Sequence, residues 1–283
     1  MGDGRFSCQG TDMSQILHTN RATFSCTGED ATHFLENLVT CLISGKPAFG
    51  ALLTPQGKIL FDFFITPIDG GYRFDCAAEQ RDELIKRLGF YKLRAKVDLA
   101  PLEEAVVTSW GDATRPDDAF DDPRLSALGW RAYRMQAEAK ADDDAWLAHR
   151  IALGVPELGV DAEPGSVFPH DMSMDQFSKG SGVAFDKGCY VGQEVVSRMQ
   201  HRGTARSRFV NVAAVNDLPE SGAELMVGDR TIGTLGSVSG QHGLALVRLD
   251  RAAKAITEGA PITADGTEVM LTLPDWVNYA WPQ

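Results

Sequence analysis

The sequence predicts an α+β protein in which antiparallel sheets carry helices and a small β-barrel or sandwich follows at the C-terminal end. Three observations favour this class. Strands are expected over 48–54 and 58–65, a strand, a helix and a strand over 72–99, and short strands with glycine turns over 209–249. The spacing over 72–99 is typical of a helix-covered antiparallel sheet, and the last pattern is typical of a barrel or sandwich.

The chain is expected to begin with an irregular leader. Residues 1–12 are polar and without pattern, and we expect Met13 to be the natural start. A strand is predicted over 17–26. The segment Thr27–Asp30 then opens a helix, because acidic residues fill the first turn. The buried stripe of this helix is expected to consist of Ala31, Phe34, Leu35 and Leu38.

The most definite local prediction is a hairpin. Thr54-Pro55-Gln56-Gly57 carries Pro at the second and Gly at the fourth position of a type I turn. Alternation along 58–65 places Asp62 on the same face as Leu60 and Phe64. Two interpretations of Asp62 stay open. It points into water at a sheet edge or pairs with an arginine, or it is aimed at a ligand and burial raises its pKa.

Further elements follow from the same patterns. We predict a strand over 72–77, a helix over 79–88, a strand over 90–99, a helix over 146–156 and strands over 209–215, 225–238 and 244–249. The segments 110–144, with one strand or two, and 161–186 are expected to be loop-rich.

Composition limits the classes of function. The net charge of -12 argues against broad DNA binding, and no apolar run approaches the roughly 20 residues of a membrane span. We therefore expect no direct nucleic-acid partner and no membrane partner. The five cysteines are widely spaced and form no CxxC pair, which excludes a zinc ribbon and favours a reducing cytoplasm. His170, Asp171 and Asp175 match no metal-site spacing, so no metal is predicted.

One stretch, Lys187-Gly188-Cys189-Tyr190-Val191-Gly192-Gln193-Glu194, carries the strongest signal for chemistry. Cys189 lies between two glycines, and Lys187 can favour its thiolate form. A short helix over 193–199 is expected to pair Glu194 with Arg198. The alternative is a buried cysteine in a Gly-rich turn, because most free cysteines behave as small hydrophobes.

A basic run follows this motif in an otherwise acidic chain. Its members are Arg198, His201, Arg202, Arg206 and Arg208. The run is either a solvated face or a seat for an anion such as a carboxylate tail or a phosphate.

The motif over 187–194, followed by Arg198 and Arg202-Gly203, resembles the signature of the YgfZ family. These are folate-binding proteins related to the aminomethyltransferase (T-protein, GcvT) of glycine cleavage. The resemblance covers roughly residues 17–250. It includes the segments 28–35, 53–60, 91–97 and 150–157.

This resemblance implies three small domains in a ring around a central hole that holds tetrahydrofolate. We expect them at 13–105, 106–204 and 205–283. It also implies a role in assembling or repairing iron–sulfur clusters in client enzymes, including enzymes that modify tRNA. Cys189 is then the working thiol, Lys187 tunes it, and Trp146 stacks on the folate. The other expected folate contacts are Arg94, Tyr190, Gln193 and Arg198.

Two departures from the T-protein pattern bear on function. Ala152 stands where T-proteins carry a glutamate that pairs with the pterin. Asp62 matches the aspartate that T-proteins aim at the reacting folate, which keeps folate-dependent aminomethyl transfer open as an alternative activity. T-proteins lack the cysteine motif, and a thiolate suits sulfur, iron or redox chemistry. The motif therefore favours the iron–sulfur role.

Overall fold

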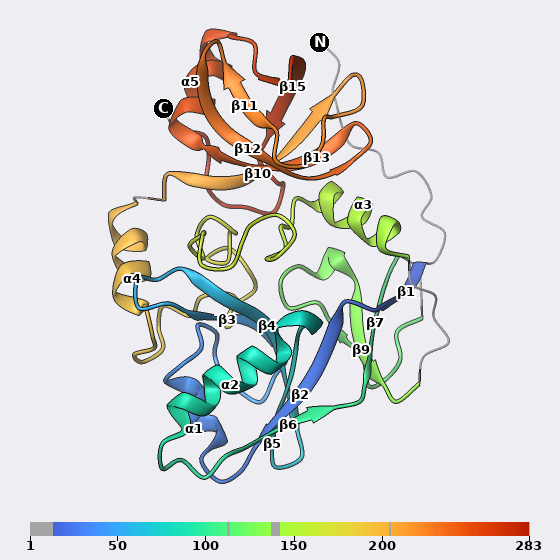
Figure 1. Cartoon of the computed structure of the whole chain (residues 1–283), viewed down its shortest axis with the longest axis vertical. Coiled ribbons are helices and arrows are strands. Elements are labelled where there is room, and N and C mark those ends of the chain that lie inside the picture. Colours follow the sequence, from blue (N-terminus) through green and yellow to red (C-terminus); the bar gives the residue numbers. More distant parts are fainter. Residues whose placement is uncertain (1–13, 112–113, 137–141, 204, 283) are drawn as a thin grey trace.

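The computed structural model describes residues 14–111, 114–136, 142–203 and 205–282. The described chain forms a five-stranded sheet, a four-stranded sheet and a closed barrel, with helices between and around them (Figure 1). The predicted α+β class with a C-terminal antiparallel barrel is confirmed. The predicted leader, Met13 and Cys8 lie outside the described residues.

The five-stranded sheet is antiparallel, with strand order β3-β4-β5-β2-β6. Its strands are β2 (Arg21–Thr27), β3 (Ala48–Leu53), β4 (Ile59–Ile68), β5 (Gly71–Ala77) and β6 (Asp98–Leu102). The predicted hairpin joins β3 and β4, and Gly57 closes its turn by donating to the carbonyl of Thr54 at 2.8 Å. Gly57 adopts φ +82°, a conformation that favours glycine.

Both faces of β4 are buried. Alternation along the strand alone would be satisfied by one buried face and one exposed face. On one face Phe61 and Phe63 pack with residues of α1 (Ala31–Glu36) and α2 (Arg81–Lys92). On the other face Phe64 packs against the long segment 155–185, including Met172 and Val183. Asp62 therefore lies in the interior, and its exposed fraction is 7%.

The four-stranded sheet has the order β1-β7-β9-β8. Its strands are β1 (Ser14–His18), β7 (Ala105–Trp110), β8 (Phe120–Asp121) and β9 (Trp130–Arg134). Two short 3-10 turns, η1 (Ala78–Gln80) and η2 (Ser126–Leu128), precede α2 and β9 respectively. The helix α3 (Asp143–Leu153) runs between this sheet and the barrel (Figure 1). Asp142 caps α3 by accepting from the Ala145 amide at 2.9 Å.

The barrel closes in the order β10-β13-β12-β11-β14-β15. Its elements are β10 (Ser207–Ala214), β11 (Glu224–Val227), β12 (Arg230–Ser239), β13 (His242–Arg248), α5 (Leu249–Glu258), β14 (Thr263–Ala264) and β15 (Thr267–Thr272). The helix α4 (Gln193–Arg202) leads into it. Closure removes the free sheet edges that would otherwise pair with other chains.

Two predicted elements are wrong. The strand expected over 17–26 is two strands, because β1 pairs with β7 while β2 pairs with β5 and β6 in another sheet. The strand expected over 90–99 begins only at Asp98, since α2 continues to Lys92 and Leu93 then turns with φ +43°. The apparent alternation over 91–97 does not reflect burial, because Tyr91 and Leu93 are both exposed. In the described part of the chain no helix is long and apolar enough to span a membrane.

Buried ion pairs join the two sheets. Asp75 of β5 accepts from Arg21 Nε at 2.7 Å and from Arg131 Nη1, on β9, at 2.9 Å. Arg124 pairs with Asp122 at 2.7 Å. The guanidinium carbons of Arg131, Arg124 and Arg21 lie 3.9, 4.8 and 5.5 Å from the centre of the Phe64 ring. Each buried charge therefore has an opposite charge or an aromatic face beside it, as burial requires.

A second buried pair joins α3 to the barrel. Arg150 donates to Asp161 Oδ2 at 2.5 Å and to Ser237 Oγ, on β12, at 2.7 Å. Asp161 also accepts from the backbone amides of Glu157 and Ser237, each at 2.8 Å. Arg150 thus fixes the segment after α3 against both its own helix and the barrel.

Candidate functional site

Asp62 lies beside a pocket that Arg21, one of the buried arginines joining the two sheets, helps to line. The pocket has a volume of about 360 Å³ and is lined by Asn20, Arg21, Ala77, Ala78, Glu79, Glu157, Leu158, Gly159 and Val160. A backbone hydrogen bond from Leu158 and the charges of Arg21 and Glu157 act on the Asp62 carboxyl. Burial raises the pKa of Asp62 to about 6, although the Arg21 guanidinium opposes the rise. Asp62 is thus a buried carboxyl beside an arginine, not a group in water at a sheet edge.

Trp146 lies in an aromatic core on α3. Its exposed fraction is 7%, and the rings of His18 and Trp110 lie 5.1 and 5.8 Å from its ring. His18 bonds to the Thr108 hydroxyl at 2.7 Å, and burial together with nearby arginines lowers its pKa well below the usual value. Trp146 packs in the structure as a core residue.

Cys189 is the one exposed cysteine among the four that the structure describes. The other three, Cys26, Cys41 and Cys76, are buried, and burial raises the pKa of each thiol to about 12. A thiol with such a pKa is almost wholly protonated at neutral pH and therefore unreactive. The alternative of a buried cysteine at position 189 is wrong.

Lys187 does not direct its hydrogen bonds at the neighbouring thiol. Its Nζ donates to the carbonyls of Val39 at 2.6 Å and Cys41 at 2.9 Å. Burial lowers the pKa of Lys187. Tyr190 is buried, its ring centre 5.3 Å from Lys187 Nζ, and burial raises its pKa. The two residues between Lys187 and Tyr190 are Gly188 and Cys189, and both are exposed.

Three other residues predicted to contact folate, Arg94, Gln193 and Arg198, belong to α4 or to the turn after α2. Arg198 of α4 forms the predicted ion pair with Glu194, and both side chains are more than half exposed. Gln193 is half-buried at the first position of α4. Arg94 is exposed in the turn that follows α2. The structure thus divides the predicted site residues among separate places.

The basic run is also divided. Arg208 is buried, pairs with Asp175 and donates to the His170 carbonyl at 2.8 Å. Its role is structural. Asp171 accepts from the Phe168 amide at 2.8 Å, and burial raises its pKa to about 6. Over the described ranges, no group of three or more candidate ligands that could hold a metal ion occurs.

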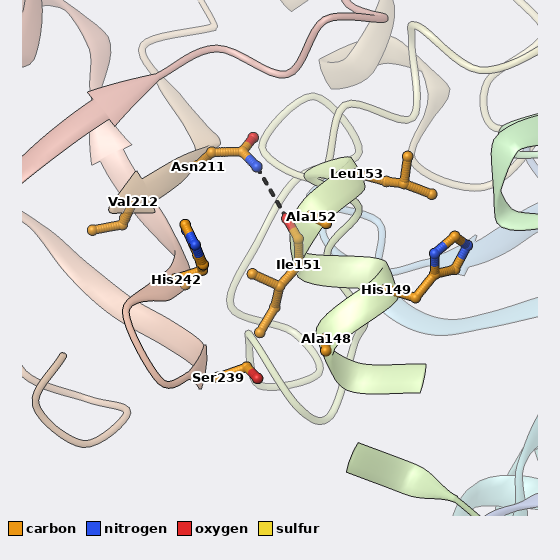
Figure 2. A pocket seen from close by; sticks show the side chains of 10 residues that line it. Ala148, His149, Ile151, Ala152, Leu153, Asn211, Val212, Ser239 and His242 are labelled. Atoms are coloured by element: carbon orange, nitrogen blue, oxygen red, sulfur yellow. Dashed lines mark hydrogen bonds between the residues drawn. The ribbon is translucent and has the colours of Figure 1, made fainter. Parts of the chain in front are cut away.

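Ala152 lines a different pocket, between α3 and the barrel, with a volume of about 250 Å³ (Figure 2). Figure 2 shows Ala148, Ile151 and Ala152 of α3 opposite Val212 and His242 of the barrel. The Asn211 amide donates to the Ile151 carbonyl at 3.0 Å and ties the two parts together. No carboxylate lines this pocket, which agrees with the absence of the T-protein glutamate at position 152.

Sequence reasoning missed the residues that surround Asp62. These residues include Arg21, which lies in β2, and Glu157, which ends the segment 150–157 named in the resemblance to the YgfZ family. The available signal was that segment itself, in which Arg150 and Glu157 are both charged in an apolar run. In the structure Arg150 Nε lies 3.5 Å from Glu157 Oε2, so each of these charges compensates the other.

Comparisons with known proteins show what this chain resembles in structure and in sequence. The chain has a TM-score of 0.73 with the aminomethyltransferase T of the glycine cleavage system from Bartonella henselae, at 13% identity, covering 96% of this chain and 88% of that one. The chain has the aminomethyltransferase fold. Residues 206–279 match the family described as CAF17, C-terminal beta-barrel domain.

The relatives found by sequence are named as iron-sulfur cluster assembly factors. The chain is 29% identical to the human iron-sulfur cluster assembly factor IBA57, mitochondrial, over 93% of this chain and 83% of that protein. It is 29% identical to the homologue from Coccidioides immitis, over 84% of this chain and 72% of that protein. The chain is therefore similar to IBA57 proteins over most of its length. Its resemblance to the YgfZ family stays a prediction.

These relatives also correct one expectation. The cysteine pattern favoured a cytoplasmic location, but the human, mouse and fungal relatives are named as mitochondrial proteins. The cytoplasmic prediction is contradicted. A reducing compartment was inferred from cysteine spacing, and spacing alone does not distinguish one reducing compartment from another.

The raised pKa of Asp62 predicts a pH-dependent stability difference. An acid whose pKa is about 6 when folded and about 3.9 when unfolded binds more protons in the folded state between these values. Its ionisation therefore destabilises the fold as pH rises through this window, by about 3 kcal/mol in full. Asp62→Asn should then gain stability relative to wild type between pH 4 and pH 6–7, measured by urea unfolding. A difference that stays constant over this range would contradict the assignment.

Proposed function

We propose that the protein is an iron–sulfur cluster assembly factor in which Cys189 is one ligand of a cluster during transfer. The exposure of Cys189, set against the burial of Cys26, Cys41 and Cys76, carries the proposal. The similarity to assembly factors such as human IBA57 supports it.

Among the cysteines that the structure describes, Cys189 is the single exposed thiol, so it can supply one cluster ligand. Iron–sulfur clusters of the [2Fe–2S] type take four ligands, usually cysteine thiolates. Within the described residues, Cys189 is not part of any group of three or more side chains that could hold a metal ion. We propose that the remaining ligands come from another molecule, either a partner protein or glutathione. The cluster is cargo that passes between two molecules.

This proposal predicts that cluster uptake requires Cys189. A [2Fe–2S] cluster held by glutathione is a defined donor. On mixing it with the protein, visible circular dichroism should report a protein-bound cluster. Cys189→Ala should slow or abolish uptake by at least ~10-fold, since the accessible thiolate is the metal ligand. Cys76→Ala is the matched control, because it removes a buried thiol and should leave uptake unchanged. Equal uptake by Cys189→Ala and wild type would reject the proposal.

We also propose that tetrahydrofolate binds at the pocket beside Asp62. The donor set there fits the ligand. The carboxylates of Glu79 and Glu157 suit the amino edge of a pterin, and Arg21 and Asn20 add donors for its carbonyl. The apolar pocket at Ala152 and the buried Trp146 fit tetrahydrofolate less well, so we propose the pocket beside Asp62 in place of a site at Trp146. When bound, tetrahydrofolate supplies a carrier for one-carbon units.

Calorimetry can locate this site. Tetrahydrofolate should bind wild type, and Glu157→Gln should weaken binding by about 10-fold, because the charge-assisted hydrogen bond to the pterin is lost. Arg94→Ala should bind as wild type does, since Arg94 is exposed in the turn after α2. Loss of binding in Arg94→Ala with normal binding in Glu157→Gln would place the ligand elsewhere.

A second candidate function is folate-dependent aminomethyl transfer. One observation favours it: Asp62 is a buried carboxyl with a raised pKa in a chain that has the aminomethyltransferase fold. In that activity Asp62 would hold or accept a proton at its carboxyl beside the reacting folate. Incubation with tetrahydrofolate and an aminomethyl-lipoyl carrier should then yield methylene-tetrahydrofolate, and Asp62→Asn should not. No product above background from wild type would remove this candidate.

A further inference from the structure

The hydrogen bonds of Lys187 point to a role different from thiol activation. We propose that Lys187 is a positioning residue, which ties the Gly188–Cys189 crest to the five-stranded sheet and so fixes where the sulfur stands. The proposal deepens the function proposed for Cys189 and rests on it. By the crest we mean the two exposed residues Gly188 and Cys189.

The carbonyls that Lys187 binds belong to a fixed part of the chain. Val39 and Cys41 are both buried and lie between α1 and β3. Val39 forms a β-bridge with Leu52, and the Thr40 amide donates to the Ala51 carbonyl at 3.0 Å. Lys187 therefore joins the crest to backbone that is itself paired with the edge strand β3.

The other end of the crest is held by apolar packing. The Tyr190 side chain is buried in the apolar cluster on the barrel side of the five-stranded sheet. Gly192 adopts φ +80° and packs against the hairpin turn, where an added Cβ would come within 2.5 Å of the Thr54 carbonyl oxygen. With anchors at 187 and 190, only two residues can move, and their reach is limited to a few ångströms.

Two of the three ammonium donors of Lys187 are used by these backbone carbonyls. The carbonyl dipoles compensate the partly buried charge, which needs such partners to remain in the interior. This arrangement stabilises a loop conformation. It assigns no hydrogen bond from Lys187 to the sulfur.

Thr40 provides a second, uncharged tie between the same two segments. Its hydroxyl donates to the Gly182 carbonyl at 2.6 Å, and its carbonyl accepts from the Ala184 amide at 2.9 Å. Thr40 is fully buried. If Lys187 acts by position, then loosening this uncharged tie should affect the crest in the same direction.

The test compares Lys187→Met, Lys187→Arg and Thr40→Val with wild type. Three quantities are measured: amide hydrogen exchange over 188–190, the pH dependence of the Cys189 alkylation rate, and cluster uptake from the [2Fe–2S] glutathione complex. We expect Lys187→Met and Thr40→Val to raise exchange at the crest by ~10-fold or more, since local opening becomes easier. Both should slow cluster uptake, and Lys187→Arg should restore most of it because arginine keeps donors for the carbonyls.

The pH profile separates position from activation. If Lys187 positions the thiol, the pH of half-maximal alkylation stays the same in Lys187→Met within ~0.3, whereas loss of an activating cation would move it upward by ~1 or more. An upward shift in Lys187→Met, or unchanged crest exchange in folded Lys187→Met, would overturn the proposal. Thermal unfolding checks that each variant is folded, and Thr40→Val provides the test if Lys187→Met is not.

These experiments distinguish failure of the cluster role proposed for Cys189 from failure of the positioning role proposed for Lys187. Exchange and alkylation involve no cluster, so they report on the anchor even if uptake does not depend on Cys189. Normal uptake by Cys189→Ala would reject the cluster role while leaving the exchange result to decide the anchor.

Discussion

Pairing of buried arginines with buried carboxylates is the constraint on which the arrangement of this protein depends. The single carboxylate of Asp75 accepts from Arg21 in its own sheet and from Arg131 in the other. Arg150 of α3 likewise donates both to Asp161 and to Ser237 of the barrel. Removing one partner from such a set leaves an uncompensated buried charge, at a cost of several kcal/mol. The sheets and the barrel therefore meet in one defined geometry.

That geometry sets the two candidate sites. Arg21 takes part in the ion pair with Asp75, contributes to the electrostatic surroundings of Asp62 and lines the pocket beside it, so the ion pair fixes one wall of that pocket. The segment that follows Arg150 packs across β4 and continues to the cysteine motif. Its last anchors, Lys187 and Tyr190, present Cys189 at the surface. The fold thus separates a buried carboxyl from an exposed thiol.

Local patterns predicted what depends on local physics. The hairpin at 54–57 follows from turn chemistry. Alternation placed Asp62 on the face of Leu60 and Phe64 but left open whether it points into water, pairs with an arginine or faces a ligand. The strand expected over 90–99 failed because residues such as Leu93 are apolar without being buried. The anchoring of Lys187 was not predictable, since its partners Val39 and Cys41 lie 148 and 146 residues away. The ion pairs of Arg21 and Arg131 with Asp75 likewise span more than 50 residues.

The central claim is that this fold exposes one thiol and buries the others that the structure describes. Mass-spectrometric measurement of alkylation rates for each cysteine in the native protein tests it most directly. The account predicts that Cys189 reacts at least ~100-fold faster than Cys26, Cys41 and Cys76, because those react only after opening of the core. Rates for any of these three that equal the rate for Cys189 would contradict it.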